Sequence, residues 1–148
     1  MKGHVIRYLS FGCCTIGAVL SGLSLHSHYG TSATDYCDLT TMFNCDLVNR
    51  SVYSEFRGVP VALIGLLGYF FLFALTALES RIMTILRLVA STVGLSFALH
   101  LAHIEASVLG VWCLLCIGSL MRISAISVLT SVAVFRIWKM ESQTHVRG

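Results

Sequence analysis

VPVALIGLLGYFFLFALTAL, residues 59–78, decides the fold of this chain. The stretch carries no charged residue, and its length matches the roughly 20 apolar residues that a helix needs to cross a bilayer. Of the 148 residues of the chain, 56% are hydrophobic and 11% are charged. Soluble domains carry about 25% charged residues, so this chain has too little polar surface for a water-soluble protein. The composition predicts an integral membrane protein. The sequence has no run of basic residues of the kind that would indicate a nucleic acid partner.

Three further apolar stretches are long enough to predict membrane helices. They lie at about residues 8–25, 82–103 and 109–135. Lys2 and Arg7 precede the first stretch, so it could also be a cleaved signal peptide, but no convincing cleavage site follows and we expect a retained helix. The prediction is an all-α membrane protein in which residues 1–148 form a single domain, a four-transmembrane-helix bundle.

The long polar stretch of the chain, residues 26–58, joins the first two helices. Within it, the apolar residues of segment 46–56 follow the spacing of one helical face, which predicts a short amphipathic helix lying on the membrane as a lid. Arg50 and Arg57 also belong to this stretch. In the predicted bundle these two residues lie on one side of the membrane. The basic residues on the other side are Lys2, Arg7, Arg81, Arg87, Arg136, Lys139 and Arg147.

Basic residues concentrate on the cytoplasmic side of membrane proteins. The chain is therefore expected to have cytoplasmic N- and C-termini. Segments 26–58 and 104–110 would face the periplasm of a bacterial inner membrane, or the lumen of the endoplasmic reticulum in a eukaryote. Either compartment is oxidising.

This topology brings two pairs of cysteines to the oxidising face. Cys37 and Cys45 lie in the polar stretch, and Cys113 and Cys116 lie one turn apart at the start of the last helix. Thiols exchange with disulfides through a mixed disulfide, so the loop pair can take electrons from a soluble protein and pass them to the deeper pair. A lipid-soluble quinone would then accept them. The alternatives are small packing residues at 113 and 116, and a purely structural disulfide between 37 and 45.

Other polar residues in the apolar stretches have two interpretations each. Cys13 and Cys14 are expected to be packing residues, and the alternative is a soft-metal site in a heavy-metal transporter. Arg122 either packs as a polar group or lies near the quinone. His100 and His103 are one turn apart and are expected at the membrane interface, although they could contact the quinone or tune a thiolate. No metal site is expected from these histidines and thiols.

Three motifs together resemble the vitamin K epoxide reductase family. They are CDLTTMFNC (37–45) with Ser51 after it, GVPVALIGLLGY (58–69) and WCLLCIGS (112–119), and the resemblance spans most of the chain. The order, loop pair first and Cys-x-x-Cys last, is also similar. The resemblance implies a four-helix membrane fold and a thiol oxidoreductase that uses a quinone.

The resemblance also implies a role for each cysteine. Cys113 and Cys116 would form the active-site disulfide, with Cys116 facing the quinone. Cys45 would attack Cys113, and Cys37 would exchange with a thioredoxin-like protein. Since no thioredoxin domain follows the last helix, that partner is expected to be a separate extracytoplasmic protein. The net effect would be disulfide formation in exported proteins.

Ser51, Tyr53, Tyr69 and His100 are the candidate quinone contacts. Ser51 and Tyr69 follow from the resemblance, Tyr53 from the predicted lid, and His100 from its position in the third helix. The chain departs from the vertebrate family members at two points. Leu120 replaces a tyrosine that binds the substrate, and an asparagine is missing near residue 61. A plain quinone (ubiquinone, menaquinone or vitamin K) is therefore the expected electron acceptor, and a vitamin K epoxide reductase proper is the alternative.

Overall fold

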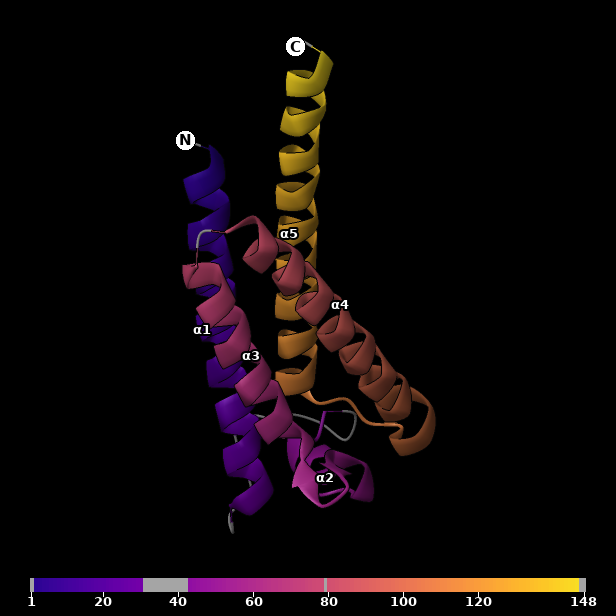
Figure 1. The fold of residues 1–148 in the computed structure, drawn as a ribbon. Coiled ribbons are helices and arrows are strands. Elements are labelled where there is room, and N and C mark those ends of the chain that lie inside the picture. The colour runs from indigo at the N-terminus through magenta and orange to yellow at the C-terminus, as the bar shows by residue number, and fades with distance from the viewer. Residues whose placement is uncertain (1, 31–42, 79, 147–148) are drawn as a thin grey trace.

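The structure, a computed structural model, describes residues 2–30, 43–78 and 80–146 (Figure 1). Most of these residues are helical. In chain order the elements are α1 (Lys2–Tyr29), α2 (Cys45–Asn49), the 3-10 turn η1 (Val52–Ser54), β1 (Glu55–Phe56), β2 (Val59–Pro60), α3 (Val61–Ala77), α4 (Arg81–Ile104), the π-helical turn η2 (Glu105–Leu109) and α5 (Leu114–Val146).

Three helices are long and apolar enough to cross a membrane. The candidate spans are His4–Tyr29 in α1, Arg81–Leu109 in α4 and η2, and Leu114–Gln143 in α5. The apolar helix α3 has 17 residues, or about 25 Å at 1.5 Å per residue, against a hydrocarbon core of about 30 Å. This make-up is that of an all-α membrane protein, as the composition predicted.

The helices pack so that distant parts of the sequence meet at two ends of the molecule. α1 packs against α3 and α5, and α4 packs chiefly against α5 (Figure 1). Both chain ends and the α3–α4 connection point toward one end, whereas α2 and the loop segments lie at the other (Figure 1). The start of α5 therefore reaches the same end as α2.

Small residues on α1 allow its close approach to the other helices. Their buried positions recur at helical spacing, at Ser10, Cys14, Gly17, Ser21, Ser24 and Ser27. The ring of Tyr69, from α3, lies directly on Gly17, where an added Cβ would be 2.3 Å from the ring. The Tyr69 hydroxyl donates a hydrogen bond of 2.8 Å to the Ser119 carbonyl oxygen, which links α3 to α5.

The ends of two helices differ from the sequence prediction. α1 runs to Tyr29 and not to residue 25, because its last turns are packed and hydrogen bonded despite their polar side chains. The last helix begins at Leu114 and not at about 109, and it continues to Val146, beyond the predicted end at 135. Gly110 has a left-handed φ of 66°, which ends the preceding helical run and leaves room for a separate start of α5.

The short amphipathic helix predicted within segment 46–56 is present only as α2 (Cys45–Asn49), and the rest of the segment has another structure. The segment forms α2, then η1, and then enters the hairpin of β1 and β2. Its two-residue turn is Arg57–Gly58, with φ of 55° and 80°, and positive φ at both positions is typical of tight hairpin turns. The lid, which we define as residues 45–60, is therefore a compact pair of turns and a hairpin.

Candidate functional site

Two cysteines from distant parts of the chain meet at the start of α5. The Sγ atoms of Cys45 and Cys113 lie 3.3 Å apart, and both residues are fully buried. Parallel pairing between Phe43 and Trp112 holds the two segments together, and the Asn44 N–H donates a 3.2 Å hydrogen bond to the Trp112 carbonyl oxygen. This backbone contact fixes the approach of the two sulfur atoms.

The first turn of α5 surrounds the Cys113 thiol with donors. Cys113 directly precedes the helix, and its Sγ accepts a hydrogen bond of 3.4 Å from the Cys116 N–H. The hydrogen bond from the Cys116 thiol lowers the pKa of Cys113 below its ordinary value of 9.0, and backbone N–H groups add to this against the opposing effect of burial. The helix start therefore favours the thiolate, which is the nucleophile in disulfide exchange.

The cysteines of the site differ in their bonding. Cys113 and Cys116 are free thiols, whereas Cys45 is disulfide-bonded. Cys37, the predicted second loop cysteine, lies outside the described residues. A free thiol thus rests against one sulfur atom of a disulfide, which is the contact from which a mixed disulfide forms.

An apolar cavity of about 570 Å³ opens beside Cys116. This volume is within the usual range for small-molecule sites, about 300–1,000 Å³. Cys116 lines the cavity and Cys113 does not, so the two thiols of the pair face different surroundings. Leu120 and Val61 also line it, and both contribute aliphatic side chains to its wall.

Three of the four predicted quinone contacts line this cavity. They are Ser51 and Tyr53 from the lid and Tyr69 from α3. The Ser51 hydroxyl donates a hydrogen bond of 2.8 Å to the Val48 carbonyl oxygen, and the Tyr69 hydroxyl is already hydrogen bonded to Ser119. His100 lies on an exposed face of α4 and is not part of the lining, so the structure gives it no place in the cavity.

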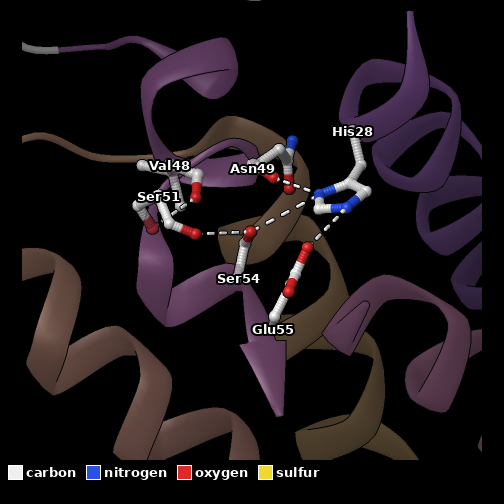
Figure 2. A network of polar contacts seen from close by, with 6 residues as sticks. All are labelled: His28, Val48, Asn49, Ser51, Ser54 and Glu55. Atoms are coloured by element: carbon white, nitrogen blue, oxygen red, sulfur yellow. Dashed lines mark hydrogen bonds and ion pairs between the residues drawn. The ribbon is translucent and has the colours of Figure 1, made fainter. Parts of the chain in front are cut away.

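A polar network attaches the lid to the end of α1 (Figure 2). His28 Nδ1 donates to the Asn49 carbonyl oxygen and lies 3.4 Å from the Ser54 hydroxyl, while His28 Nε2 is 3.5 Å from Glu55 Oε1. Two serines one turn apart on α1 add to this attachment. The Ser24 hydroxyl donates a hydrogen bond of 2.6 Å to the Asn49 side-chain oxygen, and the Ser27 hydroxyl donates one of 2.7 Å to the Asp46 carboxylate. The lid is thus fixed over the cavity by α1.

The site contains one carboxylate that sequence reasoning missed. Glu105 is 3% exposed and lines the cavity, and its Oε2 accepts a hydrogen bond of 3.1 Å from the Cys113 N–H. Its side chain also interacts with the Cys116 thiol. The signal in the sequence was a single acidic residue in an otherwise apolar connection, eight positions before Cys113, but the connection was treated only as a turn.

The remaining polar candidates lie away from this cavity. Cys14 is 1% exposed and packs with Tyr69 and Ile126, and Cys13 borders the same cluster. In the part of the chain that the structure describes, no three His, Cys, Asp or Glu side chains converge as metal ligands. Arg122 is not in the cavity lining, and its buried Nε has no hydrogen-bond partner among the described residues.

The family model described as the vitamin K epoxide reductase family matches residues 8–132. The match covers most of the chain and includes α1, the lid, the cavity and both thiols of the Cys-x-x-Cys pair.

Proposed function

Since the chain belongs to the vitamin K epoxide reductase family, an oxidoreductase family of membrane proteins, we propose that it is a thiol:quinone oxidoreductase that supports disulfide formation. The observation that carries the proposal is the 3.3 Å separation between the sulfur atoms of Cys45 and Cys113. A loop cysteine in contact with the Cys-x-x-Cys pair is what a relay of thiol–disulfide exchange requires.

In this proposal electrons move through two cysteine pairs. The dithiol of a separate thioredoxin-like protein reduces the Cys37–Cys45 disulfide. Cys45 then attacks Cys113 in the Cys113–Cys116 disulfide, and the resulting mixed disulfide is resolved by Cys37. The reduced Cys113–Cys116 pair finally transfers two electrons and two protons to the quinone. Each exchange forms one S–S bond and breaks one, so the pairs alternate between dithiol and disulfide.

Cys116 is the proposed donor to the quinone because it lines the apolar cavity. Ser51, Tyr53 and Tyr69 line the same space and are the proposed contacts of the quinone ring. The aliphatic side chains of Leu120 and Val61 favour a plain quinone over an epoxide, because they offer no donor to an epoxide oxygen. Ubiquinone, menaquinone and vitamin K are all candidates.

The proposed topology has α1, α3, α4 and α5 crossing the membrane, with both termini in the cytoplasm. The gathering of both chain ends and the α3–α4 connection at one end of the molecule supports it (Figure 1). The basic residues in these segments also support cytoplasmic termini, because Lys and Arg concentrate on the cytoplasmic side of membrane proteins. The lid and Cys113 then face the periplasm of a bacterial inner membrane, or the lumen of the endoplasmic reticulum.

The test is quinone reduction by the purified protein in detergent, with a small dithiol as donor. Cys116→Ala is expected to abolish the reaction, and Cys13→Ala is expected to leave it unchanged. Full activity of the Cys116 variant would overturn the proposed electron path. Reduction of a vitamin K epoxide at a rate equal to that of the quinone would favour the alternative, a vitamin K epoxide reductase proper.

A further inference from the structure

We propose that Glu105 is a catalytic base that removes the proton of the Cys116 thiol and returns it to the quinone. The inference rests on the proposed function, because it assigns a proton path to that reaction. Glu105 was not expected from the sequence, and it touches both members of the Cys-x-x-Cys pair.

The hydrogen bonds of Glu105 define its position relative to the reacting atoms. Oε2 accepts the Cys113 N–H at 3.1 Å, which holds the carboxylate at the start of α5. The Cys116 thiol, the group that faces the cavity, also interacts with this side chain. Glu105 lines the cavity as well, so the carboxyl residue and the Cys116 thiol border the same space assigned to the quinone.

The charge environment of Glu105 is unusual for a buried acid. No Lys, Arg or His of the described ranges lies within ion-pair distance of it, although it is 3% exposed. The titratable groups near Glu105 are the thiols of Cys113 and Cys116. Cys45, on the lid, does not titrate because it is disulfide-bonded. A buried carboxylate without a cation is costly, and the start of α5 offsets only part of that cost. Its neighbours are the backbone N–H of Cys113 and the thiol of Cys116, both from the pair that must lose protons in the reaction.

The reaction balances with Glu105 as a carrier. The Cys116 S–H bond breaks and its proton moves to the Glu105 carboxylate. An S–S bond forms between Cys113 and Cys116, and the electron pair passes to the quinone. The Glu105 carboxylic acid then gives its proton to one quinone oxygen. The second oxygen receives the proton released by the Cys113 thiol. The products are a disulfide and a hydroquinone, and Glu105 is again a carboxylate.

The test uses Glu105→Gln in the full-length protein, with Glu141→Gln as the matched control. Gln keeps an oxygen that accepts the Cys113 N–H but cannot take up a proton. Single-turnover reduction of a soluble quinone analogue by the reduced protein is expected to fall by about 10²-fold or more in Glu105→Gln, the usual size of a general-base contribution. Cross-linking of Cys45 to Cys113 is expected to proceed as in the wild type, and Glu141→Gln is expected to keep both reactions.

The pH profile separates a proton carrier from a structural residue. The wild-type rate is expected to fall as the pH drops through the range in which Glu105 becomes protonated, and the Glu105→Gln variant is expected to lack this acidic limb. Glu105→Asp, which keeps the carboxylate, is expected to recover part of the rate together with the limb. A wild-type rate and profile in Glu105→Gln would overturn the assignment, and so would parallel loss of cross-linking. Absence of quinone reduction in the wild type would instead overturn the proposed function.

Discussion

The Cys45 and Cys113 sulfur atoms lie 3.3 Å apart, although 68 positions separate the two residues in the chain. The approach is set by backbone pairing of the adjacent residues Phe43 and Trp112, and not by the sulfur atoms themselves. The contact is therefore expected to persist when the other cysteines of the site are removed.

The first prediction concerns the identity of the exchanging pair. In the double variant Cys37→Ser with Cys116→Ser, mild oxidation by oxidised glutathione is expected to join Cys45 to Cys113 nearly completely. The matched variant Cys37→Ser with Cys113→Ser keeps Cys45 and Cys116, and it should cross-link far less because Cys116 faces the cavity. Peptide mass spectrometry without reduction identifies the products. Equal cross-linking in the two variants would show that the contact does not select Cys113.

The second prediction concerns the pH dependence of Cys113. A hydrogen bond from the Cys116 side chain is the main cause that lowers the pKa of Cys113 from 9.0, so thiolate is present at lower pH than in an ordinary thiol. With Cys37→Ser as background, Cys116→Ser keeps a hydroxyl donor and Cys116→Ala removes it. The rate of cross-linking to Cys45 is expected to rise with pH in both, and at lower pH in the Ser variant. Coincident profiles would contradict the assigned cause.

The third prediction concerns the packing of α1 on α3. Gly17→Ala would place a Cβ 2.3 Å from the Tyr69 ring, which is itself buried and cannot turn away freely. Overpacking of this kind costs about 1–3 kcal/mol. Gly22→Ala is the control, because nothing lies within 4 Å of its added Cβ and alanine favours the helix. Thermal unfolding in one detergent should show a lower midpoint for Gly17→Ala alone, and a midpoint equal to that of Gly22→Ala would be inconsistent with this packing.

The fourth prediction concerns the attachment of the lid. His28→Ala removes the donor to the Asn49 carbonyl oxygen, a hydrogen bond of about 1 kcal/mol, and leaves Ser51 and Tyr53 less firmly placed over the cavity. KM for the quinone is expected to rise several-fold while kcat stays near the wild-type value. His26→Ala, on the exposed face of the same helical turn, should change neither constant. A fall in kcat with constant KM would assign His28 to the chemistry instead.

The sequence predicted those features that depend on apolar length and on which end of the molecule a connection reaches. Residues 59–78 were predicted to form a helix because a lone apolar stretch in lipid must satisfy its backbone within itself, and α3 forms over Val61–Ala77. The convergence of Cys45 and Cys113 followed from topology, since both connections end at the same face. The roles of the individual cysteines came from family resemblance, and the electron path remains a prediction.

Features that depend on side-chain direction were not predictable in this way. The lid pattern at 46–56 fitted a helical face, but the left-handed turn at Arg57–Gly58 fixed a hairpin that periodicity does not report. Glu105 and His28 acquire their importance from partners on other elements, Cys113 in one case and Asn49 in the other. His100 illustrates the reverse, since its height in the helix suited a quinone contact but its direction did not.

The small buried residues of α1 determine how the protein responds to the solvent around it. Lipid tails solvate apolar side chains as well as a protein interior does, so close contact, and not aversion to water, keeps α1 beside α3 and α5. Ser24 and Ser27 also connect α1 to the lid, so separation of α1 would release the cover of the cavity beside Cys116 at the same time. Activity should therefore depend on the chain length of the detergent used for extraction. Activity lost in detergent should return when the protein is moved into a bilayer, because lateral pressure there holds α1 against α3 and α5.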